Sequence, residues 1–238
     1  MPQKSSNRTN PCVQVILGDS HSIDTGVLLG YRPGRPIDLH PVRVGPKARL
    51  RTGTVIYASV EIGAGFETGH NVTIREETRI GDDCAIWNNS TIDYGCVLGN
   101  RVRIHNNVYV CQYTTIGDDV FFAPGVMCAN DPHPICTKCM QGPTIENGAR
   151  IGINAVVMPH VTVGKNSLVG AGSVVTVDVP EGCVALGSPA RVICRVDDLK
   201  CPFEIVQPYR QGVDVRRRSE WESVPSLPRP MKRPKVRA

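Results

Sequence analysis

The chain of 238 residues has few aromatic side chains and no long apolar run. Aromatic residues make up 5% of the sequence, which favours an interior too narrow for large rings. No stretch approaches the roughly 20 apolar residues of a transmembrane helix, so we expect no membrane contact. Residues 1–11 also lack the apolar core of a secretory signal. These absences favour a cytoplasmic protein.

Charge of one sign is in only modest excess, because the formal net charge is +5. Much of that excess lies in residues 216–237, a stretch rich in proline and arginine that has the composition of a disordered segment. A basic tail alone is a weak signal for nucleic acid, so we expect no nucleic-acid partner.

Aliphatic residues instead recur at every sixth position through most of the chain. A period of six matches neither the 3.6-residue helix nor the two-residue strand, and it is a period of parallel β-helices. The residue two positions earlier is usually small or β-branched, and on a strand it faces the same side. Each hexad therefore predicts a short strand with two inward residues, then a turn. The aliphatic positions are Val44, Leu50, Ile56, Ile62, Thr68 (the one polar exception), Ile74, Ile80, Ile86, Ile92, Leu98, Ile104, Val110, Ile116, Phe122 and Cys128, then Ile145, Ile151, Val157, Val163, Val169 and Val175.

Glycine adds a second period of eighteen residues. It follows the aliphatic residue at Gly45, Gly63, Gly81, Gly99 and Gly117. Glycine at a fixed turn position indicates either a positive φ or a close backbone approach. Three hexads therefore make one coil, and the pattern predicts an all-β triangular prism of about seven to eight coils. The handedness of the coils does not follow from the pattern.

The repeat also predicts the organisation of the chain. We expect a flexible lead over residues 1–22, the coiled domain over 23–190 and an irregular extension over 191–238, disordered from about residue 212. The polar stretch 129–144 interrupts the hexads, and such insertions in solenoids often form the binding face.

The cysteines mostly follow the hexads. Cys84 and Cys96 occupy the small inward position and Cys128 the aliphatic position, where a free thiol acts as a small hydrophobe. Without a secretory signal, reduced thiols are the default. Cys136 and Cys139, in the insertion, are the exception.

The hexads, the insertion and the closing segment 164–193, which contains GSPARVI, resemble the left-handed β-helix, hexapeptide-repeat acyltransferases. RIHNNV at 103–108 and DDVF at 118–121 are similar to sequences of bacterial enzymes that acetylate amino sugars carried on nucleotides. APGVMCANDPHP at 123–134 resembles the galactoside and maltose acetyltransferases, in which the histidine of a His-Pro pair is the catalytic base. The resemblance implies left-handed coils, a homotrimer with sites between neighbouring prisms, and acetyl-CoA along the C-terminal coils.

His133 is the histidine of that pair and the candidate base. Acyl transfer from a thioester requires removal of a proton from the acceptor, and imidazole, with an ordinary pKa of about 6.5, is suited to this. Asn130 and Asp131 lie close by in sequence and are candidates to orient the ring or bind a substrate hydroxyl. An exposed loop histidine without a role is the alternative.

His105, Asn106 and Asn107 are candidates for substrate contact at a corner of the prism. Asparagine also adopts left-handed turn conformations, so a structural corner is the alternative. The related amino-sugar enzymes usually carry glutamine where His105 stands. The resemblance also places acetyl-CoA near a second set of candidate residues. Two of them, Lys165 and Arg191, are candidates to pair with a phosphate group of CoA. This set is Gly152, Asn154, Lys165, Ala171, Gly172, Pro189 and Arg191.

The function expected is acetyl-CoA-dependent N-acetylation of a nucleotide-linked amino sugar, without a metal. O-acetylation of a sugar or antibiotic hydroxyl is the alternative. A more distant alternative is a zinc hydratase like the γ-carbonic anhydrases, which requires imidazoles that converge on one point. Another alternative is a zinc clip formed by His133, Cys136 and Cys139, whose spacing is permissive but which has no evident fourth ligand. An inert scaffold is the non-enzymatic alternative.

Overall fold

The computed structural model describes residues 13–200, and the chain divides into two units, residues 1–196 and 197–238. The expectations for residues 1–12 and for the basic tail lie outside the described residues. Of the second unit, residues 197–200 are described, and the first two of them complete a 3₁₀ helix, η1 (Val196–Asp198). Within residues 13–200, no helix is long and apolar enough to cross a membrane.

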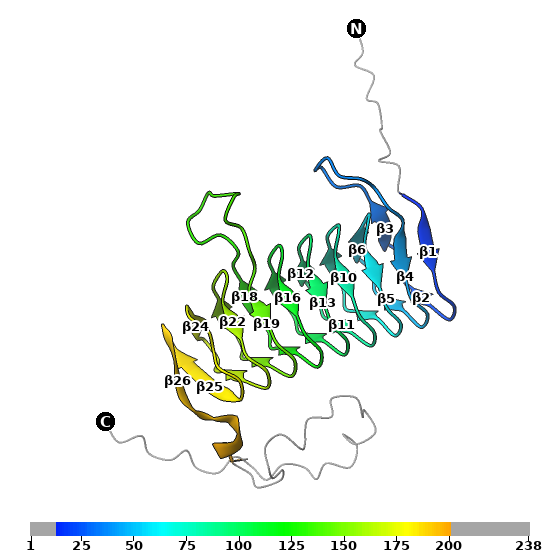
Figure 1. Ribbon diagram of the computed structural model, residues 1–238. Coiled ribbons are helices and arrows are strands. Elements are labelled where there is room, and N and C mark those ends of the chain that lie inside the picture. Colours follow the sequence, from blue (N-terminus) through cyan, green and yellow to red (C-terminus); the bar gives the residue numbers. More distant parts are fainter. Residues whose placement is uncertain (1–12, 201–238) are drawn as a thin grey trace, which may run out of the picture. The chain divides into compact units, whose positions relative to one another are not determined.

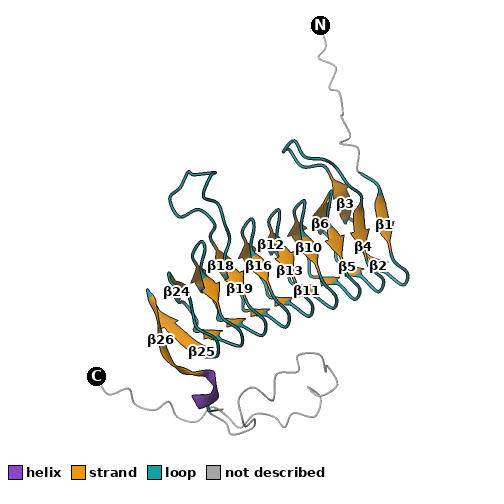
Figure 2. Cartoon of the chain, viewed as in Figure 1, coloured by secondary structure: helices purple, strands orange, loops and turns teal. Residues whose placement is uncertain are grey.

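Three sheets of short strands form the sides of the first unit (Figure 1, Figure 2). Sheet A comprises β1 (Val15–Leu17), β4 (Val42–Val44), β7 (Glu61–Ile62), β10 (Arg79–Ile80), β13 (Val97–Leu98), β16 (Thr115–Ile116), β19 (Thr144–Ile145) and β22 (Thr162–Val163). Sheet B comprises β2 (Ser22–Ile23), β5 (Arg49–Leu50), β8 (Glu67–Thr68), β11 (Ala85–Ile86), β14 (Arg103–Ile104), β17 (Phe121–Phe122), β20 (Arg150–Ile151), β23 (Leu168–Val169), β25 (Cys183–Gly187) and β26 (Ala190–Arg195). Sheet C comprises β3 (Leu28–Tyr31), β6 (Val55–Tyr57), β9 (Thr73–Ile74), β12 (Thr91–Ile92), β15 (Tyr109–Val110), β18 (Met127–Cys128), β21 (Val156–Val157) and β24 (Val174–Val175).

The chain visits sheets A, B and C in turn, so β1–β24 complete eight coils. Each strand pairs in parallel with the strand one coil away; Ile80, for example, aligns with Ile62 and with Leu98. The predicted parallel β-helix and its coil number are therefore confirmed.

The interior follows the predicted six-residue register. Ile56, Ile74 and Ile92 are fully buried in one ladder, and burial of such a side chain contributes about 1.5–3 kcal/mol. Thr68, the polar exception, is buried as well, and its hydroxyl shares a hydrogen bond of 2.9 Å with that of Thr54. The polar atom is thus paired inside the core, which removes the cost of burying it alone.

The repeated glycines serve the close approach of neighbouring coils. A Cβ on Gly63 would lie 2.8 Å from the carbonyl carbon of Gly81, and the φ of Gly63 is not positive. The left-handed conformation falls two residues later in the turn, as at Asp83 (φ 53°) and Arg101 (φ 57°). Of the two explanations that the sequence allowed, backbone proximity is the one that holds.

The first coil begins earlier than predicted. β1 pairs with β4, and Leu17, Ile23 and Leu29 align with Val44, Leu50 and Ile56. Residues 15–22 therefore belong to the coils, and the predicted boundary at residue 23 is wrong. The first strand, β1, lay outside the predicted coils because residues 32–41 separate the first coil from the second and shift its hexads out of register.

The coiled unit also extends beyond the predicted end at residue 190. β25 pairs in parallel with β23 and then forms an antiparallel hairpin with β26. This hairpin continues sheet B past the last coil.

Two loops leave the coils between sheet C and sheet A. Residues 32–41 connect β3 to β4, and residues 129–143 connect β18 to β19. Because both connections turn from sheet C to sheet A, both loops project from one edge of the prism, which we call the C–A edge (Figure 1). The turns from A to B and from B to C form the A–B and B–C edges.

Candidate functional site

Loop 129–143 is organised by the carboxylate of Asp131. The amide of His133 donates to Asp131 Oδ1 at 3.0 Å, and the amide of Cys136 donates to Asp131 Oδ2 at 2.7 Å. The base of the loop closes where the amide of Gln141 donates to the carbonyl of Asn130 at 2.9 Å. Both oxygens of Asp131 therefore shape the loop that presents the histidine.

His133 is exposed on this loop and lies beside two thiols. A ring nitrogen of His133 and the sulfurs of Cys136 and Cys139 all lie within 4.8 Å of one another. Hydrogen bonding from the amide of Lys138, together with the thiol and amide of Cys139, lowers the pKa of the Cys136 thiol. The histidine can thus reach a reactant from outside the prism, and it shares its surroundings with two polarisable sulfur atoms.

Asn130 faces a polar network that sequence reasoning missed. Its side-chain amide donates to Gln112 Oε1 at 2.6 Å, and Gln112 Nε2 donates to Asp93 Oδ2 at 2.5 Å. The hydroxyl of Tyr109 donates to the same oxygen at 2.7 Å. Burial and the neighbouring Asp93 carboxylate raise the pKa of Tyr109, so its hydroxyl stays a donor.

The same network reaches the other loop through charged groups. Arg75 lies 3.4 Å from Asp93 and also pairs with the fully buried carboxylate of Glu76 at 2.9 Å. Arg35, from loop 32–41, donates to Glu76 at 2.8 Å, and its guanidinium stacks 3.8 Å from the centre of the Tyr94 ring.

Burial would raise the pKa of Glu76, but hydrogen bonds from the two arginines outweigh it and hold that pKa below its ordinary value. We call Arg35, Arg75, Glu76, Asp93, Gln112 and Asn130 the edge network, because it links both loops along the C–A edge. The sequence does contain a pattern that indicates this network. Polar residues recur at an interval of eighteen, the length of one coil, at Glu76, Tyr94, Gln112 and Asn130.

His105, Asn106 and Asn107 lie on the B–C edge, after β14. The His105 ring packs edge-on against Phe121, with 5.5 Å between centroids. Asn106 Oδ1 accepts a hydrogen bond of 3.0 Å from the amide of Asn88, and Asn107 adopts φ 58°. Asn106 and Asn107 thus build the turn, and within one chain the three residues occupy a different edge from His133.

The predicted cofactor residues divide among three places. Gly152, Asn154, Ala171 and Gly172 follow β20 and β23 and continue the B–C edge that carries His105. Pro189 and Arg191 lie exposed at the β25–β26 hairpin.

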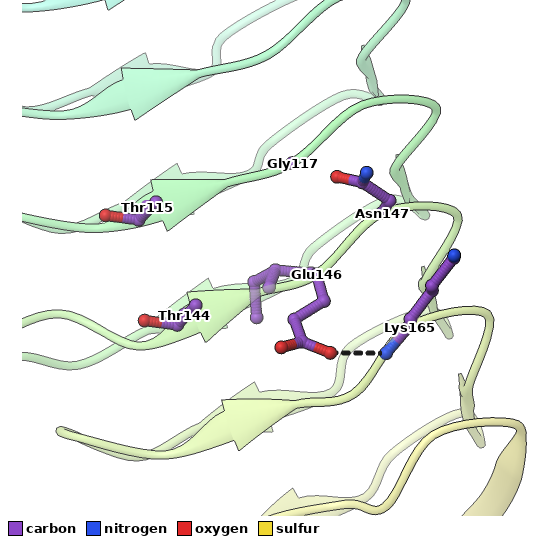
Figure 3. Close-up of a pocket in the computed structure, with 7 residues that line it drawn as sticks. Thr115, Gly117, Thr144, Glu146, Asn147 and Lys165 are labelled. Carbon is purple, nitrogen blue, oxygen red and sulfur yellow. Dashed lines mark hydrogen bonds between the residues drawn. The ribbon is translucent and has the colours of Figure 1, made fainter.

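Lys165 lies on the A–B edge, and its amide donates to Glu146 Oε2 at 2.8 Å. It borders an open depression that Thr115 and Thr144 also line (Figure 3). The structure thus gathers part of the predicted cofactor set on the B–C edge and separates it from Lys165.

Comparison with known families gives the same repeat. The bacterial transferase hexapeptide model (six repeats) matches residues 95–130 and 142–176, on either side of the loop. The hexapeptide repeat of succinyl-transferase matches residues 77–112. These stretches of the chain are similar to the hexapeptide repeats of that transferase family.

Several relatives of the chain carry acetyltransferase names. Galactoside O-acetyltransferase of Escherichia coli is 39% identical over 115 residues, which cover 42% of this chain and 57% of that protein. Bifunctional protein GlmU of Thermosipho africanus is 31% identical over 159 residues, which cover 65% of this chain and 28% of that protein. The chain therefore spans about half the length of the first relative and less of the second.

A solved structure shares the fold. The UDP-N-acetylglucosamine acyltransferase of Arabidopsis superposes with a TM-score of 0.56 at 18% identity, covering 76% of this chain and 70% of that one. Together with the repeat, this likeness identifies the fold as a left-handed parallel β-helix, as the resemblance implied.

Proposed function

We propose that this hexapeptide-repeat protein is an acetyl-CoA-dependent acetyltransferase whose acceptor is the amino group of a nucleotide-linked amino sugar. The observation that carries the proposal is the presentation of His133. It stands exposed on the loop that interrupts the later coils, and Asp131 holds the loop's shape through two backbone amides. A base that acts on an external acceptor needs this combination of access and support.

The proposed reaction uses His133 as the proton acceptor. The acceptor nitrogen attacks the thioester carbonyl of acetyl-CoA and gives a proton to the imidazole, directly or through water. The carbon–sulfur bond then breaks, the acetyl group stays on nitrogen as an amide, and the CoA thiolate takes up a proton. Acetyl-CoA would lie along the B–C edge beside Gly152, Asn154, Ala171 and Gly172.

This arrangement requires a second copy of the chain. His133 projects from the C–A edge, whereas His105 and the B–C edge glycines belong to another edge of the same prism. A site that combines both edges forms where the C–A edge of one prism meets the B–C edge of its neighbour. We therefore propose a homotrimer with sites between subunits, and sedimentation at micromolar concentration should show three chains per particle.

O-acetylation of a sugar hydroxyl is the second candidate. The 39% identity to a protein named galactoside O-acetyltransferase favours it. The two functions differ in their need for a base. A fraction of the amine acceptor is already unprotonated near neutral pH, whereas a hydroxyl acceptor keeps its proton until a base removes it.

The test is CoA thiol release from acetyl-CoA across nucleotide-linked amino sugars and simple galactosides, with metal-free full-length protein. We expect His133→Asn to keep acetyl-CoA binding and to lower kcat by about 10²–10⁴-fold, towards the smaller loss for an amine. His21→Asn is the matched control, since that exposed ring bonds only the nearby carbonyl of Gly18 in the described structure. Wild-type turnover in His133→Asn would refute the assignment of the base, and absence of release with every acceptor would refute the function.

A further inference from the structure

The donor atoms that loop 129–143 gathers are those of a metal site. We propose that His133, Cys136 and Cys139 bind one Zn²⁺ ion, contrary to the expectation of a protein without metal. Their ligand atoms already lie within 4.8 Å of one another. Tetrahedral zinc, with bonds of about 2.0–2.3 Å, needs ligand atoms roughly 3.5 Å apart. Exposed His133 and Cys139 side chains can close that difference by rotation, without moving the coils.

The loop backbone is already arranged for the ion. Asp131 fixes the amides of His133 and Cys136, as described above, so the carboxylate sets the spacing of two of the three ligands. The His160 ring, from the turn after β21, lies 3.0 Å from the carbonyl of Cys139 and supports the third. Such partners behind the ligands orient them towards a metal.

The donor set selects the class of ion. Two sulfurs and one imidazole nitrogen suit zinc and exclude Mg²⁺ and Ca²⁺, which take oxygen ligands. Binding releases one proton from each thiol, and two thiolates then balance the charge of the ion. Among residues 13–200 no fourth histidine, cysteine or carboxylate joins the cluster. The fourth position is therefore open to water, a pattern of three protein ligands that zinc proteins use at reactive sites.

Metal binding has a consequence that rests on the proposed function. A ring nitrogen that binds zinc has no lone pair for a proton, and the other nitrogen then carries hydrogen. A zinc-loaded His133 cannot serve as the base, so zinc occupancy and acetyl transfer exclude each other.

The binding test uses the full-length, reduced, metal-free protein titrated with Co²⁺. We expect one ion per chain, visible bands of tetrahedral cobalt, near-ultraviolet thiolate-to-cobalt charge transfer, and displacement by Zn²⁺. Asp131→Asn should weaken metal binding by roughly 10–100-fold, the loss typical when a partner that orients a metal ligand is removed. Cys136→Ser and Cys139→Ser should each weaken binding by more than this, because each removes a ligand. His133→Asn should also lose tight binding.

Cys194→Ser is the control, since that half-buried thiol lies in β26, outside the cluster. Its cobalt spectrum should match that of the wild type. Failure of the wild type to show charge transfer, because the two thiols form a disulfide or stay protonated, would overturn the metal site. Unchanged spectra in the Cys136→Ser and Cys139→Ser variants would overturn the assignment of its ligands.

The second arm separates the metal site from the proposed function. Stoichiometric Zn²⁺ should suppress thiol release by the wild type, and a chelator should restore it. The Cys136→Ser/Cys139→Ser double variant, compared with itself, should release thiol at the same rate with and without Zn²⁺. Unchanged or faster wild-type release with zinc would overturn the competition. A protein inactive in every state would refute the acetyltransferase, while the cobalt spectrum would still decide the metal site.

Discussion

The coils and loop 129–143 obtain their structure from different kinds of contact. In the coils, each inward side chain lies against residues one coil before and one coil after it, so Ile80 meets Ile62 and Leu98. In the loop, the backbone is held by contacts that do not repeat, among them the two hydrogen bonds that the Asp131 carboxylate accepts. The same packing contacts recur in every coil, whereas the hydrogen bonds of the loop occur only once in the chain. A disruptive substitution inside the coils should therefore unfold the whole coiled unit. A substitution in the loop should affect only activity or ligand binding.

The largest expected effect comes from a charge inside the coils. Ile86→Asp should prevent folding, because Ile86 is fully buried between aligned residues and a carboxylate there has no partner. Circular dichroism and sedimentation should show loss of the folded particle. Glu67→Ala, one coil earlier on the outward face of sheet B, should leave the melting temperature almost unchanged. Equal tolerance of both changes would contradict the register.

The edge network joins the two regions, and its centre is Glu76. Glu76→Gln should lower the free energy of unfolding by about 3 kcal/mol, at the low end for a broken buried ion pair, because Arg35 and Arg75 keep 32% and 27% exposure. Urea unfolding measures the change. Glu61→Gln, whose pair with Arg79 is solvent-exposed at 3.7 Å, should change nothing measurable. A comparable loss in both variants would show that burial of the pair is irrelevant.

The Glu76 carboxyl also predicts how the free energy of unfolding changes at acid pH. The pKa of Glu76 is lower in the folded protein than in an unfolded chain, so its stabilisation is fully present above the unfolded value of about 4.3. It is lost as the pH falls through the lower, folded value. The difference in unfolding free energy between wild type and Glu76→Gln should therefore shrink as the pH drops below about 4. A constant difference down to pH 2 would contradict the shift.

A smaller effect is expected from a single methyl group between coils. Gly63→Ala should cost roughly 1–3 kcal/mol, because its Cβ would lie 2.8 Å from backbone of the next coil. Gly34→Ala, in loop 32–41, has open space around the new Cβ and should be close to neutral. Thermal unfolding of the two variants compares them directly. A neutral Gly63→Ala would show that the coils can separate at that turn.

The smallest perturbation is chemical labelling of the native, metal-free protein. Cys84 and Cys96 are buried, and burial raises their thiol pKa values to about 11 and about 12, so both should resist a thiol reagent. Cys139 is exposed on the loop, so it should be labelled before the two buried thiols. Mass spectrometry of digested protein identifies the labelled sites. Rapid labelling of Cys84 without unfolding would contradict the inward register.

The sequence by itself determined the coils, because a hexad predicts its inward residues wherever it occurs and parallel pairing places equivalent residues together. It also located the interruption at residue 129 and the histidine within it. The first strand, β1, was missed because loop 32–41 shifts Leu17, Ile23 and Leu29 out of step with the later hexads.

Tertiary structure alone decided which side chains meet across the loops and edges. Arg35 reaches Glu76 across 41 residues of sequence, and no local pattern predicts such a pair. The glycines repeat for the approach of the next coil, although a turn with positive φ was equally consistent with the sequence. His133, Cys136 and Cys139 come together because Asp131 bends the loop around its carboxylate. Periodic contacts can be predicted since each resembles the last, whereas these contacts occur once and depend on the path of the folded chain.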